Sequence, residues 1–311
     1  MPILLSIAIF LAGLLVAAVG GNLFLRGVVD LARWLRVPSG LIGVTVAAFA
    51  TSSPELAVSV TAAVRHQPEI GVGDALGSNV VNAGLVLGLA LLSAPLKVAG
   101  PGLRRDWVVA LAAPVVTAAF LLDGALSRAE AGALLAGFFG WLAAVVRGAR
   151  RHRQEQPVEE AVQLVPMAFS LLGGVAALLG AGHLAVFGAR GIGGALGLSA
   201  FVTGATLVAV GTSIPELVTT VIAARRGHDD VSVGTILGSN LFNGLLIAGV
   251  SGSIHPARLA WREAAISLAF GVLTTLLMVP GADGVLSHRR GGALVLAYMV
   301  YLALVVQSGQ G

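Results

Sequence analysis

Residues 43–56 read GVTVAAFATSSPEL, and the same pattern returns at residues 204–217 as GATLVAVGTSIPEL. A second pair follows, LGSNVVN at 76–82 and LGSNLFN at 237–243. All matched positions differ by 161 residues, without a gap between the two blocks. Chance similarity between apolar segments would not preserve Thr-Ser-x-Pro-Glu and Gly-Ser-Asn-x-x-Asn at one common offset. The chain therefore contains an internal duplication, which decides its fold.

The composition is too apolar for a soluble domain. Of the 311 residues, 57% are hydrophobic, 11% are charged and 42 are glycine. Soluble domains carry about 25% charged residues, whereas membrane helices are rich in the small residues that let backbones pack closely. The basic residues lie in short loops between apolar runs, so we predict a lipid bilayer as partner and no nucleic acid. Because cysteine is absent, disulfides and thiolate metal sites are excluded.

Ten apolar runs are long enough to cross a bilayer, which takes roughly 20 residues. They cover approximately residues 2–32, 37–64, 70–96, 106–122, 129–148, 163–189, 198–224, 231–253, 260–280 and 291–308. The first run is too long for the apolar part of a signal peptide, and no basic residue precedes it, so we interpret it as the first span. The sequence predicts an all-α polytopic membrane protein with ten transmembrane helices.

Positive charge is divided unequally between the loops. The loops after the odd-numbered spans hold 14 of the 19 lysines and arginines. Since cytoplasmic loops carry an excess of these residues, we expect the odd-numbered loops in the cytoplasm and both termini outside it. The chain would then be a multi-pass protein of the cell (inner) membrane. Residues 149–162 form the longest connection, which we interpret as a cytoplasmic linker.

The two copies of the repeat should have opposite orientations in the membrane. Residues 1–148 and 163–311 each contain five spans, so the second copy enters the bilayer from the opposite side. Transporters with such inverted repeats bind their substrate near the midplane, where helices are interrupted. Pro54 and Pro215 lack the N–H that a helix needs and should interrupt spans 2 and 7. We expect Gly77 and Gly238 to interrupt spans 3 and 8.

Two glutamates in the middle of spans, Glu55 and Glu216, indicate an ion pathway. A carboxylate at the bilayer centre costs at least about 2.5–3.5 kcal/mol, so such residues are usually functional. The repeats surround them with further oxygen atoms, from Thr51, Ser52, Thr212, Ser213, Ser78, Ser239, Asn82 and Asn243. An all-oxygen site suits hard cations, and calcium takes about 6–8 oxygen ligands. No cofactor is expected, only transported ions.

Charge suggests how such a site could exchange ions. Two ionised glutamates are neutralised by one calcium ion or by two sodium ions. A neutral, loaded site could switch its access from one side to the other, whereas the empty double anion should resist switching. Competition of sodium and calcium for the same charge would then produce antiport.

These motifs closely resemble the two alpha-repeats of the sodium/calcium exchanger family, over essentially the whole chain. The resemblance implies ten helices in two inverted five-helix repeats and electrogenic exchange of sodium for calcium. By motif position, Glu55 and Glu216 would be the main calcium ligands, and the backbone carbonyls of Thr51 and Thr212 would contribute. The sodium sites would involve Ser52, Ser213, Ser78, Ser239 and the carbonyls of Ala48 and Ala209. Asn82 and Asn243 would complete the centre, and the long first and sixth helices would slide across it.

Three further residues need an interpretation. Some members of this family carry an acidic residue at the position of Asn243, so its absence here puts potassium dependence in doubt. Asp74 lies four residues before Ser78, where the second copy has Thr235, and we expect it at the membrane interface more than among the ligands. His183 of span 6 aligns with Asn22 of span 1 and is expected to be a polar packing residue.

Other functions fit the sequence less well. A calcium/proton antiporter could use the same glutamates, but its motif is usually Gly-Asn-x-x-Glu instead of the Thr-Ser-x-Pro-Glu found at 51–55 and 212–216. A sodium-coupled solute symporter needs an asymmetric, partly apolar pocket. An enzyme is the weakest alternative, because the chain has no His-Glu-x-x-His or Gly-x-Ser-x-Gly motif in its spans. No obligatory protein partner is predicted.

Overall fold

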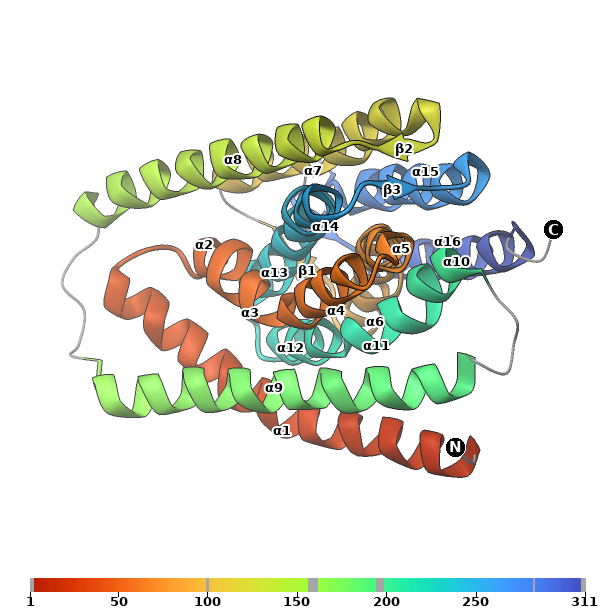
Figure 1. Ribbon diagram of the computed structural model, residues 1–311. Coiled ribbons are helices and arrows are strands. Elements are labelled where there is room, and N and C mark those ends of the chain that lie inside the picture. The colour runs from red at the N-terminus through yellow and green to blue at the C-terminus, as the bar shows by residue number, and fades with distance from the viewer. Residues whose placement is uncertain (1–2, 99–100, 156–161, 194–198, 282, 309–311) are drawn as a thin grey trace.

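A computed structural model describes residues 3–98, 101–155, 162–193, 199–281 and 283–308. Within these residues, eight helices are long and apolar enough to cross a membrane, and two bent helix pairs bring the total to ten. The prediction of an all-helical membrane protein with ten spans is therefore confirmed. Figure 1 shows the first half of the chain in red to yellow and the second in green to blue.

The first half contains spans 1 to 5 and two short strands. Its elements are α1 (Ile3–Leu35), α2 (Ser39–Ile42), the π-helical η1 (Gly43–Ala47), α3 (Ala48–Thr51), α4 (Ser53–Val64), α5 (Pro68–Val80), the π-helical η2 (Val81–Leu87), α6 (Gly88–Ser93), β1 (Leu96–Lys97), α7 (Pro101–Phe120), the 3₁₀-helix η3 (Leu121–Asp123), β2 (Ala125–Leu126) and α8 (Arg128–Glu155). The predicted linker, residues 149–162, thus begins inside α8, and its residues 156–161 lie outside the described part of the chain.

The second half repeats this order. Its elements are α9 (Leu164–Gly193), α10 (Ala200–Thr203), the π-helical η4 (Gly204–Val208), α11 (Ala209–Thr212), α12 (Ile214–Arg225), α13 (Asp229–Leu241), the π-helical η5 (Phe242–Ile247), α14 (Ala248–Ile254), β3 (Ala257–Arg258), α15 (Trp261–Met278), β4 (Val285–Leu286) and α16 (His288–Ser308). The π-helical segments therefore recur at matching positions, in spans 2, 3, 7 and 8.

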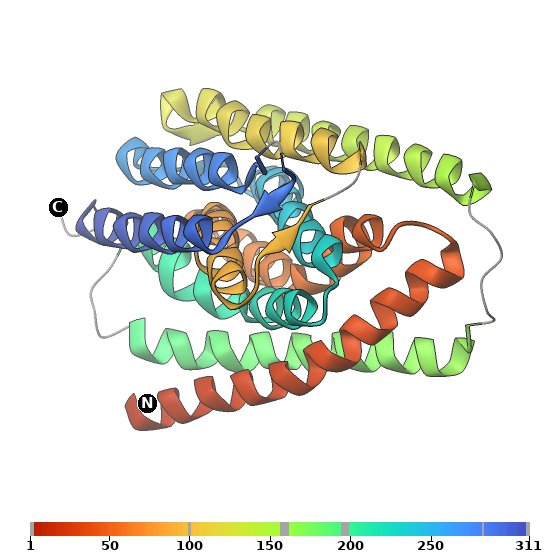
Figure 2. The ribbon, with the colours of Figure 1, turned by 180° about the vertical axis from the view of Figure 1, so that it is seen from behind.

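The halves are inverted relative to one another. Helices α1 and α9 begin the two halves, lie side by side and run in opposite directions (Figures 1 and 2). Strand β1 pairs with β4, and β2 pairs with β3, both antiparallel. Each ladder thus joins a loop of one half to a loop of the other. Loops after spans 3 and 9 meet, as do loops after spans 4 and 8, which requires each pair to share one side of the membrane.

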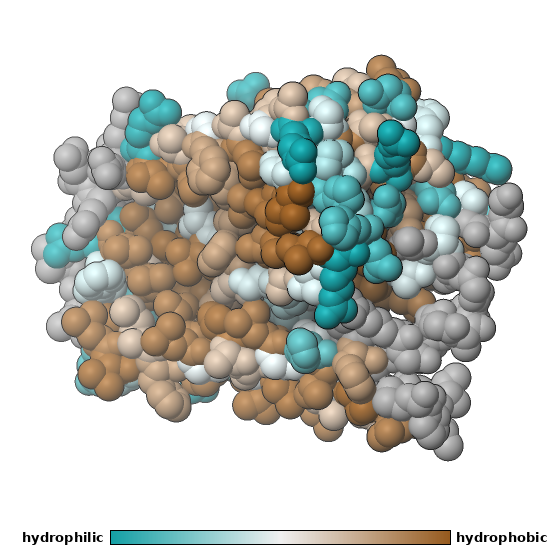
Figure 3. All heavy atoms as spheres, in the orientation of Figure 1, coloured by the Kyte–Doolittle hydropathy of each residue, from teal (hydrophilic) through white to brown (hydrophobic). Residues whose placement is uncertain are grey.

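Spans 2, 3, 7 and 8 form the centre of the molecule, between the α1–α9 pair and the outer helices α7, α8, α15 and α16 (Figures 1 and 2). Apolar side chains cover the outside, as on α9, where Val165, Phe169 and Leu172 are 68–80% exposed. Figure 3 shows hydrophobic residues along much of the face formed by α1 and α9. In water such a surface would be unfavourable, whereas lipid tails can cover it.

The interruption of the central spans agrees with the prediction at the prolines and differs from it at the glycines. Spans 2 and 7 bend by 44° and 45°, between α3 and α4 and between α11 and α12. Gly77 and Gly238, however, lie inside the continuous helices α5 and α13. A Cβ atom on Gly77 would lie 2.4 Å from the Ala205 carbonyl oxygen, and one on Gly238 would lie 2.3 Å from that of Val44. These glycines therefore let spans of opposite halves touch, and they do not break a helix.

Candidate ion-binding site

The two breaks place a glutamate in the same local setting twice. Ser52 has φ −85° and ψ 8°, and Ser213 has φ −79° and ψ 8°, so each stops one helix and precedes the next. Pro54 and Pro215 occupy the first turns of α4 and α12, where a missing N–H costs nothing. Glu55 and Glu216 follow directly and are fully buried. The positive end of each new helix stabilises the carboxylate beside it.

Each glutamate accepts a hydrogen bond from the opposite half. The hydroxyl of Ser52 donates to Glu216 Oε1 at 3.0 Å, and that of Ser213 donates to Glu55 Oε1 at 3.5 Å. Ser239 also donates to Glu216 Oε1, at 3.1 Å. Glu55 and Glu216 are close enough to interact electrostatically. The structure therefore brings the two acidic positions of the repeat into one polar centre.

Threonine hydroxyls and backbone carbonyls lie at the end of each first half-helix. Thr51 Oγ1 lies 3.1 Å from the carbonyl oxygen of Ala47 and 3.3 Å from that of Ala48. Thr212 Oγ1 repeats this arrangement with Val208 and Ala209, at 3.1 and 3.2 Å.

The Ala48 and Ala209 carbonyls, which we named as candidate sodium ligands, already accept the N–H groups of Ser52 and Ser213. A carbonyl oxygen has two lone pairs, and the hydroxyls of Thr51 and Thr212 also approach these oxygens, at 3.3 and 3.2 Å. A cation bound there would take the place of a threonine contact.

The two asparagines of the repeats are buried polar groups that the protein does not satisfy. Asn82 in η2 and Asn243 in η5 are 0% exposed, and neither amide nitrogen nor oxygen has a partner among the described residues. The Oε2 atoms of Glu55 and Glu216 are also buried and have no hydrogen-bond partner among the described residues. Buried polar atoms are nearly always paired, so unsatisfied groups of this number in one region indicate a place for an ion or water. π-Helical turns are frequent at such sites.

The expectation that Asp74 lies at the membrane interface is wrong. Asp74 is 0% exposed, and its helix α5 packs against α4, η4 and α15. Thr212 Oγ1 donates to Asp74 Oδ1 at 3.1 Å, and Ser78 lies within 3.5 Å of the same oxygen. Asp74 also interacts electrostatically with Glu55. It belongs to the site, as its spacing from Ser78 could have indicated, since residues four apart share one face of a helix.

The ligand groups in this centre are carboxylates, hydroxyls, amides and carbonyls. No group of three His, Cys, Asp or Glu side chains in the described residues converges as a metal centre would. Calcium also binds hydroxyl, amide and carbonyl oxygens besides carboxylates, so the donor set as a whole fits a hard cation. Hydrogen bonds join the glutamates and hydroxyls that the sequence analysis selected, and Asn82 and Asn243 are buried in the π-helical turns η2 and η5. Their role as ion ligands stays a prediction.

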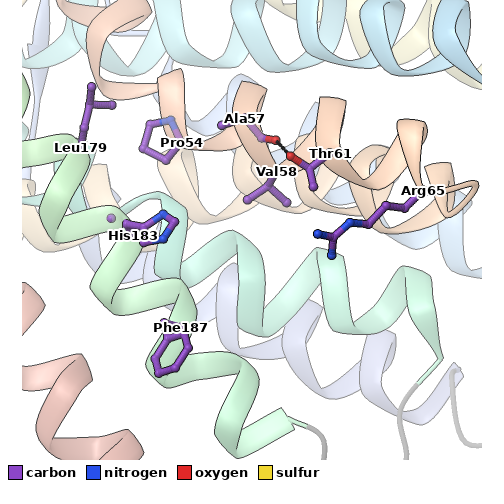
Figure 4. Close-up of a pocket in the computed structure, with 9 residues that line it drawn as sticks. Pro54, Ala57, Val58, Thr61, Arg65, Leu179, His183 and Phe187 are labelled. Carbon is purple, nitrogen blue, oxygen red and sulfur yellow. Dashed lines mark hydrogen bonds between the residues drawn. The ribbon is translucent and has the colours of Figure 1, made fainter.

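A cavity reaches the first break from the side of α9. It has a volume of about 470 Å³ and is lined by α4 and α9. Figure 4 shows Pro54 at one end of it and Arg65 near the other, with His183 and Phe187 contributed by α9. His183, which we expected to pack within the protein, is instead an exposed side chain on this cavity. The cavity therefore reaches Pro54, which directly precedes Glu55 in α4.

Comparison with known proteins agrees with this architecture. The sequence model of the sodium/calcium exchanger protein family matches residues 5–147 and 167–307. The inner membrane protein YrbG of Escherichia coli is 33% identical over 96% of this chain and 97% of its own. The sodium/calcium exchanger MaX1 of Methanosarcina acetivorans is 27% identical over 97% of this chain and 99% of its own.

A solved structure of the sodium–calcium exchanger NCX_Mj, soaked with Na⁺ and Sr²⁺, is similar with a TM-score of 0.81 and 30% sequence identity, over 97% of this chain and 98% of that one. The match covers nearly the whole chain and therefore extends over both halves. Sequence and structure thus lead to the same conclusion: this chain is a multi-pass membrane protein that belongs to the sodium/calcium exchanger family.

Proposed function

We propose that the protein exchanges sodium for calcium by alternating access, with Glu55 and Glu216 as the shared ligands of both ions. The observation that carries this proposal is the crossed pairing of each glutamate with a serine of the opposite half. A cation between the glutamates would be held by both repeats at once. Relative movement of the halves would then open the same site to one side or the other, as inverted repeats allow.

Different oxygen atoms around the glutamates would bind calcium and sodium. Calcium, as a divalent cation, would bind between Glu55 and Glu216, with the backbone carbonyls of Thr51 and Thr212. Sodium would occupy positions beside the hydroxyls of Ser52, Ser213, Ser78 and Ser239 and the carbonyls of Ala48 and Ala209. Asn82 and Asn243 would supply amide oxygens to the centre, which accounts for their unsatisfied state. Each hydroxyl can rotate its proton away when a cation arrives.

Helices α1 and α9 are suited to move across this centre. Gly182 of α9 lies against the rings of both Pro54 and Pro215, since a Cβ there would be 3.1 Å and 3.7 Å from their Cγ atoms. Gly21 of α1 lies against Val218 of α12 in the same way. Small residues leave few side chains to interlock at these crossings. We therefore propose that the α1–α9 pair slides over the breaks and alternately covers the two sides of the site.

The orientation and location follow from charge. We propose a cell (inner) membrane location, with both termini outside the cytoplasm, because basic residues favour the odd-numbered loops. The match to an inner membrane protein of Escherichia coli supports this location. Proton-coupled calcium transport is the second candidate. His183, an exposed polar side chain on the cavity beside Pro54, is the observation that favours it.

Calcium uptake into proteoliposomes tests the function. Vesicles loaded with sodium are diluted into sodium-free buffer containing radioactive calcium, beside vesicles that have only a proton gradient. We expect uptake with the sodium gradient and none in the variants Glu55→Gln and Glu216→Gln. Calcium uptake that depends on the proton gradient and not on sodium would show that the protein is a calcium/proton antiporter. Absence of calcium movement under both gradients would reject both.

A further inference from the structure

The cavity between α4 and α9 lies at a helix crossing that the repeat forms twice. Its mirror is the crossing of α12 with α1, where a Cβ atom on Gly21 would lie 2.7 Å from Val218 Cγ1 and 3.4 Å from Ile222 Cδ1. At the cavity, the residues that correspond to Val218 and Ile222 are the smaller Ala57 and Thr61. Small residues on α4 thus leave open a space that larger side chains fill on α12.

An arginine follows the last helix turn at both crossings, but its surroundings differ. Arg226, which follows α12, donates from its guanidinium to the side-chain oxygen of Asn22 in α1, at 2.5 Å. The corresponding pair in the other half is Arg65 and His183, and both line the cavity (Figure 4). Among the described residues, no ion pair involves Arg65. Its guanidinium can therefore bind an anionic group, for which planar, multiple donors are well suited.

The cavity extends through about one leaflet of the bilayer. Pro54, at one end, lies near the middle of span 2, and Arg65 directly follows the end of α4. The 11 residues from Pro54 to Arg65 rise about 16 Å along a helix. One leaflet contributes about half of the hydrocarbon core, which is roughly 30 Å thick. Arg65 therefore lies at the depth of the lipid headgroups, and the rest of the cavity lies at the depth of the acyl chains.

The wall of the cavity is mostly apolar and faces lipid. Leu179, His183 and Phe187 recur every four residues on α9, so they share one face of that helix. Phe187 is 55% exposed, and the face formed by α1 and α9 is largely hydrophobic (Figure 3). An apolar channel with a cation at its outer end is complementary to an acyl chain with an anionic headgroup.

We propose that this cavity binds an anionic phospholipid. One acyl chain would lie between α4 and α9, along Ala57 and Leu179, and the phosphate would accept hydrogen bonds from Arg65. The phosphate would then have the role for Arg65 that the Asn22 side chain has for Arg226. A headgroup with a cationic end, such as choline, would bring a second positive charge towards Arg65 and should bind more weakly. The site is independent of which ions the protein exchanges.

Lipid titration of the purified protein in detergent tests the site. A ligand that binds the folded state raises the unfolding temperature, so we expect a saturable rise with phosphatidylglycerol and a smaller one with phosphatidylcholine. The variant Arg65→Gln should raise the half-saturating phosphatidylglycerol concentration by roughly tenfold, because a hydrogen bond to a charged group is lost. Arg226→Gln is the matched control and should respond as wild type, since Arg226 already donates to Asn22. Equal responses to the two lipids, or an unchanged response of Arg65→Gln, would overturn the site.

A second variant tests the cavity while Arg65 is retained. Ala57→Val/Thr61→Ile installs the side chains of the second half and should lose the response to phosphatidylglycerol. Its unfolding temperature without lipid shows whether the variant is folded. A response equal to that of wild type would place the lipid elsewhere and overturn the proposal.

Water is the alternative occupant of the cavity, and a single cysteine distinguishes it from lipid. In phosphatidylglycerol liposomes with a charged, water-soluble thiol reagent on both sides, Ala57→Cys should not be labelled. Gln67→Cys, just beyond the end of the same span, is the control and should be labelled. Labelling of both cysteines at similar rates would show that water fills the cavity and would overturn the lipid site.

Discussion

The hydroxyl of Ser52, in the first half of the chain, donates a hydrogen bond of 3.0 Å to the carboxylate of Glu216 in the second half. The reciprocal pair, Ser213 and Glu55, is formed at 3.5 Å. Neither half can therefore complete the site alone. Since the halves are joined at the proposed ion ligands, a change in how they pack would also change how a bound ion is held.

Removal of the Ser52 hydroxyl should weaken sodium binding. The variant Ser52→Ala loses one of the proposed oxygen ligands of sodium, so we expect it to raise the sodium concentration for half-maximal exchange by roughly tenfold, which corresponds to about 1.4 kcal/mol. Ser213→Ala should have a smaller effect, because its bond is longer. The adjacent Ser53→Ala is the control, since Ser53 Oγ donates to the carbonyl of Phe49 in its own span. An equal shift in all three variants would contradict a specific role of Ser52.

The close crossing of spans at Gly77 and Gly238 should tolerate no side chain. Gly77→Ala and Gly238→Ala would each place a methyl group within 2.4 Å of a backbone oxygen of the opposite half. Overpacking of this kind destabilises by about 1–3 kcal/mol, so both variants should unfold at a lower temperature in detergent. Gly140→Ala in α8, where no atom lies within 4 Å of the added carbon, should leave the unfolding temperature unchanged or raise it. If all three variants unfolded at the same temperature, the spans would not be in close contact at Gly77 and Gly238.

The inverted arrangement can be tested with a matched pair of single cysteines, because the natural chain has none. Gln67 and His228 occupy the same place in the two halves, just before α5 and α13. We expect a membrane-impermeant thiol reagent added outside intact cells to label Gln67→Cys and not His228→Cys. Labelling of both from one side would contradict inverted repeats. The opposite pattern would retain the inversion and reverse the proposed orientation.

A disulfide between α1 and the core should stop transport if α1 slides. A Cβ atom on Gly21 would lie 3.5 Å from Val218 Cβ, a separation that suits a disulfide of about 3.5–4.5 Å between these atoms. In the variant Gly21→Cys/Val218→Cys, oxidation should abolish sodium-driven calcium uptake and reduction should restore it. Calcium uptake by the single variant Val218→Cys should be the same under oxidising and reducing conditions. Full activity of the oxidised double variant would show that α1 does not move against α12.

Features that depend on short stretches of chain could be predicted from the sequence. The duplication at an offset of 161 residues, the ten spans and the bends beside Pro54 and Pro215 all follow from local patterns. A proline acts on the turn that contains it, and a span is recognised by its own length and hydropathy. The positions of Glu55 and Glu216 within those spans were equally visible, and the structure places both, buried, in the first turn after each bend. Their role as ion ligands stays a prediction.

Asp74 and the two glycines show what only the tertiary structure decided. Asp74 was expected at the interface because its sequence neighbours do not reveal that Thr212 of the opposite half meets its carboxylate. Gly77 and Gly238 were expected to break helices, whereas their role is set by carbonyl oxygens of the opposite half. Burial and close contact depend on how two inverted halves pack against each other. The sequence determined each half and its candidate ligands, but the pairing of Ser52 with Glu216, and of Thr212 with Asp74, exists only because residues more than 130 positions apart meet in the folded chain.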